Sequence, residues 1–224
     1  MAGFRHEWKI EINAMDAAVI RSRLRAVAKE DTHGRGGKYE IRSLYFDNLK
    51  DKALREKIDG VNAREKFRIR YYNKDISLIK LEKKRKYNGL TGKESVLLSA
   101  EEAQKIAEGD TSFMVHSGKK LLTELYSKMQ TQGLAPKTIV DYTREAFVYP
   151  AGNVRVTLDY NIRTGIGGTD FLNPDCVTIP AGDAGIIMEV KWDAFLPDII
   201  RDAVQLPGRR AGAYSKYAAC RIYG

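Results

Sequence analysis

Residues 63–72 read AREKFRIRYY and place basic side chains at every second position, at Arg64, Lys66, Arg68 and Arg70. Residues 79–86, IKLEKKRK, repeat this spacing with Lys80, Glu82, Lys84 and Lys86. Successive side chains of a β-strand point to opposite faces, so each stretch predicts a strand with one charged and one apolar face. Like charges on paired strands repel one another, and the charged face therefore indicates a bound anion.

The same alternation of charged and apolar residues occurs in four further stretches. Their charged or polar positions are Arg5, Glu7, Lys9 and Glu11; Tyr142 and Arg144; Arg155, Thr157 and Asp159; and Glu189 and Lys191. For any single strand, an antiparallel sheet with one face in water is the commoner cause of such a pattern. Repetition across six strands, with several arginines and few neutral residues, favours an anion site instead.

Length and composition favour one domain over residues 1–224. The chain has 224 residues, 43% of them hydrophobic, which is enough for one sizeable core, and no Pro/Gly/Ser-rich linker divides it. The net charge of +9 and the pI near 9.4 indicate an anionic partner. Nucleic acid, an anionic membrane surface and a polyanionic small molecule all satisfy that condition, and charge alone does not choose among them.

The two cysteines, Cys176 and Cys220, form no CxxC pair, which excludes a disulfide scaffold and makes a reducing compartment the default. The N-terminal MAGFRHEWKI lacks the apolar run of a signal peptide, and no apolar stretch reaches the roughly 20 residues of a membrane span. We therefore expect a soluble, cytoplasmic protein that does not insert into a membrane.

The order of predicted elements is mostly strand with a few helices. Asn13 is a predicted helix N-cap, and Ser99 with Glu102 forms a predicted capping box. Strands are expected at residues 4–12, 38–47, 63–72, 76–86 and 93–98 and over much of 141–192, and helices at 14–29, 49–57, 100–109, 119–130, 198–205 and 214–220. This order predicts an α+β fold in which an antiparallel, closed or nearly closed β-barrel carries helices outside.

Several familiar motifs are missing. Gly34, Gly36 and Gly37 are not followed by a predicted helix and make no dinucleotide fingerprint, and there is no GxxxxGK[ST] phosphate loop. The three histidines are scattered, so a histidine-rich zinc site is not expected, and no GxSxG elbow or cysteine signature supports covalent catalysis. Positioning and electrostatics remain, and these are the means by which phosphoryl transfer is catalysed.

Eight motifs occur in an order that resembles a known family: RHEWK, IRSLYFDN, REKFRIRYY, IKLEKKRK with a following GKES, VDYTREAF, VRVTLDYNIR, IMEVKWDAFLP and YSKY. From Arg5 to Tyr217 the chain resembles the polyphosphate polymerase domain of the vacuolar transporter chaperone (VTC) type. That family belongs to the CYTH-like triphosphate tunnel metalloenzymes. The resemblance implies an antiparallel barrel that encloses a tunnel lined by Arg, Lys and Glu.

The resemblance also implies roles for single residues. The catalytic, phosphate-contacting candidates are Lys9, Arg68, Arg70, Lys84, Arg144 and Lys216. Tyr142 and Ser215 match neighbouring motif positions, and the charged faces add further substrate-binding candidates: Arg5, Lys66, Lys80, Lys93, Arg155 and Lys191. Glu189 occupies the metal-binding position of the EVK motif. Glu7 and Glu82 are either further ligands of Mn²⁺ or Mg²⁺ or counter-ions of the basic wall.

Two positions depart from the family pattern. Arg5 stands where tunnel enzymes often place the first glutamate of ExExK, and Ala213 stands where the eukaryotic polymerases have a lysine before the final aromatic-S-K run. The first departure leaves the number of metal ions open. The second leaves the polyphosphate chain length, and polymerase activity itself, open.

The expected function is that of a metal-dependent polyphosphate polymerase, which transfers the γ-phosphoryl group of ATP to a growing inorganic polyphosphate chain. Hydrolysis of triphosphate or tripolyphosphate on the same scaffold is the nearest alternative, and a non-enzymatic polyphosphate-binding or RNA-binding module is another. Most aromatic residues fall on the apolar faces, which argues against nucleic acid as a partner. The expected partners are ATP and inorganic polyphosphate or triphosphate, and coupling to translocation would require a further, unidentified membrane protein.

Overall fold

The computed structural model describes residues 4–31, 34, 36–183 and 185–222. The strands are β1 (His6–Ile12), β2 (Lys29–Glu30), β3 (Lys38–Asp47), β4 (Arg64–Tyr72), β5 (Asp75–Tyr87), β6 (Leu90–Leu98), β7 (Ala135–Tyr149), β8 (Val154–Thr164), β9 (Ile179–Pro180) and β10 (Ile186–Trp192). The helices are α1 (Ala14–Val27), α2 (Lys52–Ile58), α3 (Ala100–Glu108), α4 (Lys120–Gln132), α5 (Asp198–Val204) and α6 (Lys216–Cys220), with a 3₁₀ turn at Ala151–Asn153.

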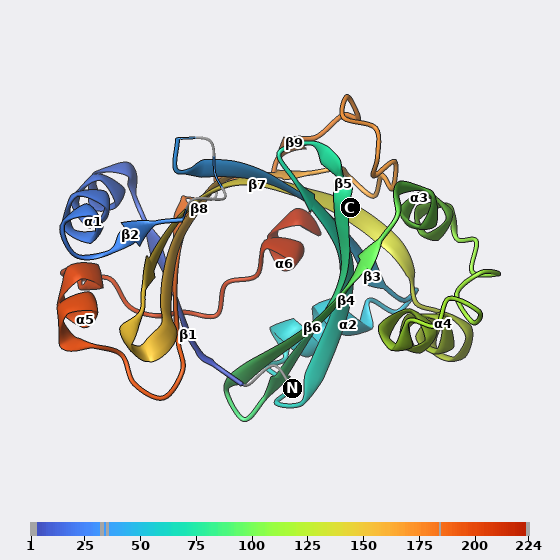
Figure 1. Ribbon diagram of the computed structural model, residues 1–224, viewed down its shortest axis with the longest axis horizontal. Coiled ribbons are helices and arrows are strands. Elements are labelled where there is room, and N and C mark those ends of the chain that lie inside the picture. Colours follow the sequence, from blue (N-terminus) through green and yellow to red (C-terminus); the bar gives the residue numbers. More distant parts are fainter. Residues whose placement is uncertain (1–3, 32–33, 35, 184, 223–224) are drawn as a thin grey trace.

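All strands belong to one antiparallel sheet with the order β1-β10-β8-β7-β3-β4-β5-β6, to which β2 and β9 add short pairs at β7 and β8. The sheet curls into a half-barrel (Figure 1). Its two edges meet where Arg5 and Thr91 exchange backbone hydrogen bonds of 3.0 Å in both directions. The predicted α+β fold with an antiparallel barrel is therefore confirmed.

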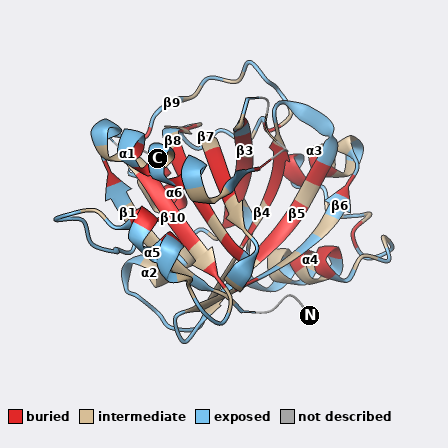
Figure 2. Cartoon of the chain, turned by 60° about the vertical axis from the view of Figure 1, so that its left-hand side comes forward, coloured by how far each residue is buried: buried red, intermediate tan, exposed pale blue. Residues whose placement is uncertain are grey.

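The outer face of the half-barrel is apolar and is covered by helices in two places. Ile69 and Leu81 of β4 and β5 pack beneath α3 and α4, whereas Val156 and Val190 of β8 and β10 pack beneath α1 and α5. Figure 2 shows the buried positions that run along these strands. Since the apolar side chains of each strand are committed to this outer core, the charged side chains of the same strands face inward.

Local capping follows the sequence prediction. The Asn13 side chain accepts a 2.8 Å hydrogen bond from the Asp16 backbone N–H, and the Ser99 hydroxyl accepts one of 3.1 Å from Glu102 N–H. In both cases the acidic residue bonds back to the cap, which completes a capping box. In the described part of the chain, no helix has the length and apolar character needed to cross a membrane.

The short helix α6 lies within the curve of the sheet, whereas α1, α3, α4 and α5 lie outside it (Figure 1). Tyr217 is buried there, stacks on Tyr45 at a ring distance of 5.1 Å and donates a 2.7 Å hydrogen bond to Asp47 Oδ2. Asp47 also accepts from the backbone N–H groups of Ala53 and Leu54 at the start of α2. One carboxylate thus ties α2 and α6 to the end of β3.

Candidate functional site

Glu189 of β10 stands at the centre of the inner face and is surrounded by cations. Its carboxylate accepts hydrogen bonds of 3.0 Å from both Lys191 and Lys216, while Lys9 Nζ and Arg144 Nη2 lie 3.7 and 3.8 Å away. Burial alone would raise the pKa of Glu189, but these four cations outweigh it and hold the pKa well below its usual range. Glu189 is therefore a carboxylate inside the tunnel.

Asp159 of β8 is a second buried carboxylate of this group, and the sequence prediction placed it on the charged face without a role. Arg144 of β7 forms a fork with it, at 2.6 Å for both the Nε–Oδ1 and the Nη2–Oδ2 pairs. Lys216 Nζ lies 2.5 Å from Asp159 Oδ2. Asp159 therefore holds Arg144 and Lys216 in fixed positions, so both cations are preorganised before any ligand binds.

Glu7 of β1 joins the two sides of the half-barrel. Lys84 reaches it from β5 at 3.1 Å, and Lys191 and Lys9 lie 3.4 and 3.9 Å from its oxygens. Burial opposes ionisation of Glu7, yet the attraction of Lys84, Lys9 and Lys191 lowers its pKa below the usual range. The predicted residues Lys9, Lys84 and Lys191 thus meet at one place although their strands are far apart in the sequence.

A second cluster lies on β3, β4 and β5 around Glu82. Arg68 donates to Glu82 at 2.8 Å and to the Tyr45 hydroxyl at 2.7 Å. Arg70 donates to Ser43 Oγ and to the Tyr142 hydroxyl, both at 2.9 Å, and lies 3.8 Å from Glu82. These contacts aim two guanidinium groups into the interior.

Lys93 of β6 completes the second cluster, with its Nζ 3.2 Å from Glu82 Oε1. Glu82 is 1% exposed and its pKa is lowered, because Arg68, Arg70 and Lys93 outweigh the cost of burial. Glu82 shares none of its cations with Glu7 or Glu189, so the structure does not bring the three predicted metal ligands to one place.

Tyr142 of β7 connects the two clusters. Its hydroxyl accepts from Arg70 of the second cluster. Its ring faces Lys216 Nζ and Arg144 Cζ of the first cluster at 4.9 and 5.4 Å from the ring centre. Cations over the face of an aromatic ring are attracted by its quadrupole, so Tyr142 helps to hold positive charge from both sides.

Several inward-facing cations have no ion pair with a carboxylate in residues 4–31, 34, 36–183 and 185–222: Lys57, Arg64, Lys66, Lys80 and Lys86. Burial, together with Lys9 and Arg68, lowers the pKa of Lys66 to about 8, although the Tyr45 phenol nearby acts in the opposite direction. Burial and Arg64 also lower the pKa values of Lys57 and Lys86. An excess of unneutralised positive charge is the expected property of an anion site.

Four of these cations, Lys57, Arg64, Lys66 and Lys86, line a cavity at the mouth of the tunnel, and Lys80 does not. One part of the cavity, of about 100 Å³, is lined by Glu7, Lys9, Lys66 and Lys84. An adjoining part, of about 480 Å³, is lined by Ile58, Gly60 and Asn62. Five residues line both parts: Lys57, Arg64, Lys86, Ala213 and Ser215. Ser215 is the N-cap of α6 and accepts a 3.3 Å hydrogen bond from Ala218 N–H. Lys57 was not predicted as a site residue, because it lies on a helix and outside the alternating strands.

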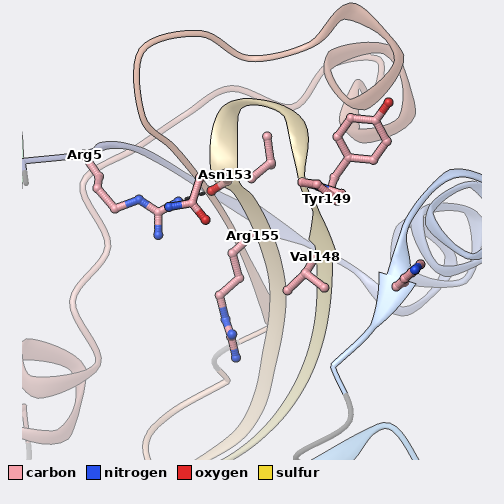
Figure 3. A pocket seen from close by; sticks show the side chains of 8 residues that line it. Arg5, Val148, Tyr149, Asn153 and Arg155 are labelled. Atoms are coloured by element: carbon pink, nitrogen blue, oxygen red, sulfur yellow. Dashed lines mark hydrogen bonds between the residues drawn. The ribbon is translucent and has the colours of Figure 1, made fainter.

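Arg5 and Arg155 line a different cavity, of about 290 Å³, at the turn between β7 and β8 (Figure 3). Arg5 donates to Asp193 at 2.7 Å and to the Asn153 carbonyl. Arg155 donates to Asp31 at 2.5 Å and to the Tyr39 hydroxyl at 2.7 Å. The structure therefore does not place these two predicted substrate-binding residues in the central clusters, although both lie on the predicted phase of their strands.

The carboxylates of the first cluster suit a hard divalent cation. Glu7 and Glu189 both contact Lys9 and Lys191 and so converge on one region. Mg²⁺ is commonly bound by one or two carboxylates together with phosphate oxygens, and these two residues could supply that pair of ligands. No group of three or more His, Cys, Asp or Glu side chains suited to a metal ion occurs in the described residues, so the remaining ligands would have to come from substrate and water.

Comparison with solved structures finds similar proteins. A candidate adenylate cyclase from Bacillus halodurans has a similar structure, with a TM-score of 0.50, 15% identity and coverage of 84% of this chain and 79% of that one. Another candidate adenylate cyclase, from Vibrio parahaemolyticus, has a TM-score of 0.46 and 10% identity. That match covers 90% of this chain and 83% of the other. The first likeness shows a shared fold. A comparison with curated proteins gives no match.

The sequence itself matches the model of one protein family, over residues 4–222. That span contains every described strand and helix and all residues of both inner-face clusters. The chain belongs to the VTC domain family.

Proposed function

We propose that this protein is a metal-dependent polyphosphate polymerase that transfers the γ-phosphoryl group of ATP to the end of a polyphosphate chain. The observation that carries the proposal is the set of inward-facing cations without carboxylate partners beside two clusters of preorganised Arg and Lys residues. Such a wall attracts a linear polyanion and not a neutral substrate. The proposal also follows the family to which the chain belongs.

The chemistry requires charge neutralisation more than proton transfer. Arg68, Arg70 and Arg144 would contact the transferring phosphoryl group, each already held by Glu82, Tyr142 or Asp159. Because their positions are fixed before the reaction, little reorganisation is needed as charge develops. The attacking oxygen of an acceptor phosphate is already ionised, so the step needs no general base.

Glu7 and Glu189 are the residues that would hold a divalent cation, Mn²⁺ or Mg²⁺. When bound there, the ion would offset negative charge on the bridging phosphate oxygens. Lys9 and Lys191 contact both carboxylates in the described structure. With the two carboxylates engaged by the ion, both lysines would be available to pair with phosphate oxygens.

The deciding experiment incubates the pure protein with ATP and Mn²⁺ and separates the products on a gel and by phosphate assay. A ladder of polyphosphate supports the proposal, whereas free phosphate alone would assign the site to hydrolysis. Arg68→Gln should abolish product formation, and Arg201→Gln, on the exposed surface of α5, is the matched control. If the folded protein binds tripolyphosphate but forms neither polyphosphate nor free phosphate, it is a binding module and not an enzyme.

Binding is tested separately by thermal denaturation. Tripolyphosphate should raise the melting temperature, because a ligand that binds only the folded state stabilises it by mass action. Duplex DNA at equal phosphate concentration should do less, since a double helix cannot enter a single small barrel. Equal stabilisation by both ligands would indicate a surface patch and would contradict an enclosed site.

A further inference from the structure

Tyr45 of β3 is a buried phenol that contacts two cations of the inner face. Its hydroxyl accepts a 2.7 Å hydrogen bond from Arg68 Nη1, and the Arg68 guanidinium carbon lies 5.6 Å from the centre of its ring. Lys66 Nζ lies over the same ring, 5.2 Å from its centre. Tyr45 and Arg68 are cross-strand partners and Lys66 precedes Arg68 by two residues, so the three side chains share one face of the sheet.

Lys66 has this ring as a partner in place of a carboxylate. Arg68 forms an ion pair with Glu82, whereas Lys66 forms none with a carboxylate in the part of the chain that the structure describes. Lys66 and Arg68 repel each other as neighbours on one face of β4. The face of an aromatic ring attracts a cation but does not cancel its charge. The Tyr45 ring therefore keeps both cations beside the cavity that Lys66 lines and leaves their charge available to an anion.

The ring of Tyr45 is itself held by helix α6. It stacks on Tyr217 with 5.1 Å between the ring centres, and Tyr217 donates a 2.7 Å hydrogen bond to Asp47, two residues after Tyr45. Stacked aromatic pairs are favourable beyond the area that they bury. Because burial and stacking fix this ring, Lys66 and Arg68 are held in place before an anion binds.

Tyr39, on the same face of β3, shows what is particular to Tyr45. Its hydroxyl also accepts a 2.7 Å hydrogen bond from an arginine, but that arginine, Arg155, is paired with the carboxylate of Asp31. Burial raises the pKa of Tyr39 above its ordinary value. Burial acts in the same direction on Tyr45, yet the cations of β4 outweigh it and lower the pKa of Tyr45 to about 7.

Positive charge prevails around the Tyr45 hydroxyl. The charged and titratable groups packed around it are Lys66, Arg68 and Arg70 of β4, Tyr142 of β7, Tyr217 of α6 with its partner Asp47, and Glu82 of β5, which is bonded to Arg68. Among these described residues neither carboxylate bonds to Tyr45 itself. The phenol is thus the group that stands between the cations of β4 and the last helix.

We infer that Tyr45 is a positioning residue that holds Lys66 and Arg68 side by side as a phosphate-binding pair. The inference rests on the proposed function and adds an aromatic residue to its basic wall. Phenolate and phosphate compete for the same two cations, so a bound phosphate chain favours the neutral phenol. Anion binding near neutral pH is therefore coupled to the uptake of one proton from solvent by the Tyr45 oxygen.

The first measurement needs no ligand. The near-ultraviolet absorbance of phenolate is followed between pH 6 and pH 9 for the wild type and for Tyr45→Phe. The difference should show one tyrosine that ionises near pH 7, and Lys66→Met should move this ionisation to higher pH, because one neighbouring cation is lost. Tyr39→Phe, which removes a hydroxyl of the same kind outside the two clusters, is the matched control and should leave the ionisation unchanged. A difference that shows no ionisation below pH 9 would overturn the inference.

The second measurement titrates tripolyphosphate by calorimetry in EDTA. Tyr45→Leu removes the ring and should weaken tripolyphosphate binding about tenfold, as expected when cations lose a desolvated aromatic partner. Tyr45→Phe keeps the ring and should bind within about threefold of the wild type at pH 6. At pH 8, tripolyphosphate should reduce the phenolate absorbance of the wild type and of Tyr39→Phe, and should leave that of Tyr45→Phe unchanged. A purely structural role of Tyr45 would not produce this absorbance change.

The inference and the proposed function fail in different ways. A wild-type protein that binds no tripolyphosphate would contradict the proposed function and the inference with it. Tripolyphosphate binding of equal strength in the wild type and in Tyr45→Leu would contradict only the role of Tyr45. If Tyr45→Leu does not fold, the absorbance changes that separate the wild type from Tyr45→Phe still decide.

Discussion

Lys216 of α6 lies 3.0 Å from Glu189 of β10, and the same ammonium group lies 2.5 Å from Asp159 of β8. One cation from a short helix thus pairs with two carboxylates on adjacent strands. Removing one partner of a buried ion pair generally costs several kcal/mol, because the remaining charge stays desolvated. The position of α6 inside the half-barrel is therefore an electrostatic requirement of the interior as well as a packing contact.

Replacing Glu189 with Gln should separate binding from turnover. The substitution keeps the size of the side chain and removes the charge that would hold a divalent cation. Tripolyphosphate binding should survive, because the basic wall remains, while turnover should fall about 10²-fold or more, as for loss of a preorganised electrostatic contact. The measurement is steady-state turnover against Mn²⁺ concentration. Glu145→Gln, which removes a buried carboxylate paired with Arg21 on the outer face, is the control.

Normal turnover with a normal Mn²⁺ dependence in Glu189→Gln would show that Glu189 is not a metal ligand. A similar loss in Glu145→Gln would instead attribute the effect to the general loss of a buried ion pair.

Glu82→Gln should affect stability and anion affinity in opposite directions. Without the carboxylate, Arg68 and Arg70 lose their common counter-ion, and the free energy of unfolding should fall by about 3 kcal/mol. The two arginines are then free to pair with phosphate, so tripolyphosphate should bind several times more tightly. Urea denaturation with and without tripolyphosphate measures both effects. Weaker tripolyphosphate binding would mean that Glu82 takes part in holding the ligand.

Anion binding should weaken as the pH rises through about 8, because Lys66 then loses its proton. In the free folded protein the pKa of Lys66 is about 8, below its ordinary value of 10.5. Between pH 8 and pH 10.5 the Lys66 side chain is therefore protonated in the unfolded chain and largely neutral in the folded one. A rise in pH through this range thus favours folding as far as Lys66 is concerned. Bound phosphate has the opposite effect, since it favours the ammonium form. Titrations of tripolyphosphate between pH 7 and pH 9 should show the decline, and Lys66→Met should remove that component. An unchanged pH profile in Lys66→Met would exclude Lys66 as its origin.

Substitutions of Arg5 and of Arg144 should have very different effects on turnover of ATP, although both residues alternate with apolar residues in the sequence. Arg5 is partly exposed and forms an ion pair with Asp193, a kind of contact worth about 1 kcal/mol or less. Arg5→Gln should therefore change the KM for ATP less than about threefold. Arg144→Gln would remove the proposed charge-assisted contact to the phosphates and should lower kcat/KM by about 100-fold. Comparable losses in the two variants would extend the binding site to the β7–β8 turn.

The alternating pattern predicted the inner face of the sheet because side-chain direction in a strand depends only on position along that strand. Such a pattern does not predict that Lys84 contacts Glu7, because this contact depends on how the curled sheet brings β5 close to β1. Arg155 has the predicted direction, but its position along the barrel is set by register and puts it beside Asp31 and Tyr39.

The sequence predicted the site residues on helices less well than those on strands. The caps at Asn13 and Ser99 are local hydrogen bonds between near neighbours in the sequence, so the residues themselves predict them. Lys57 lines the tunnel mouth on α2, and the start of α2 is bonded to Asp47 of β3, a tertiary contact that the helical pattern does not contain. The same applies to α6, whose buried Tyr217 bonds to Asp47.

The place of Lys216 in the chain has a consequence during protein synthesis. All ten described strands precede α6 in the sequence, so they leave the ribosome before Lys216 does. The sheet can pair while Asp159 and Glu189 still lack this cation, and the interior acquires its final charge balance only when the last helix enters it. A released chain truncated before residue 216 would therefore keep every described strand but would leave Asp159 and Glu189 without the cation that both of them contact.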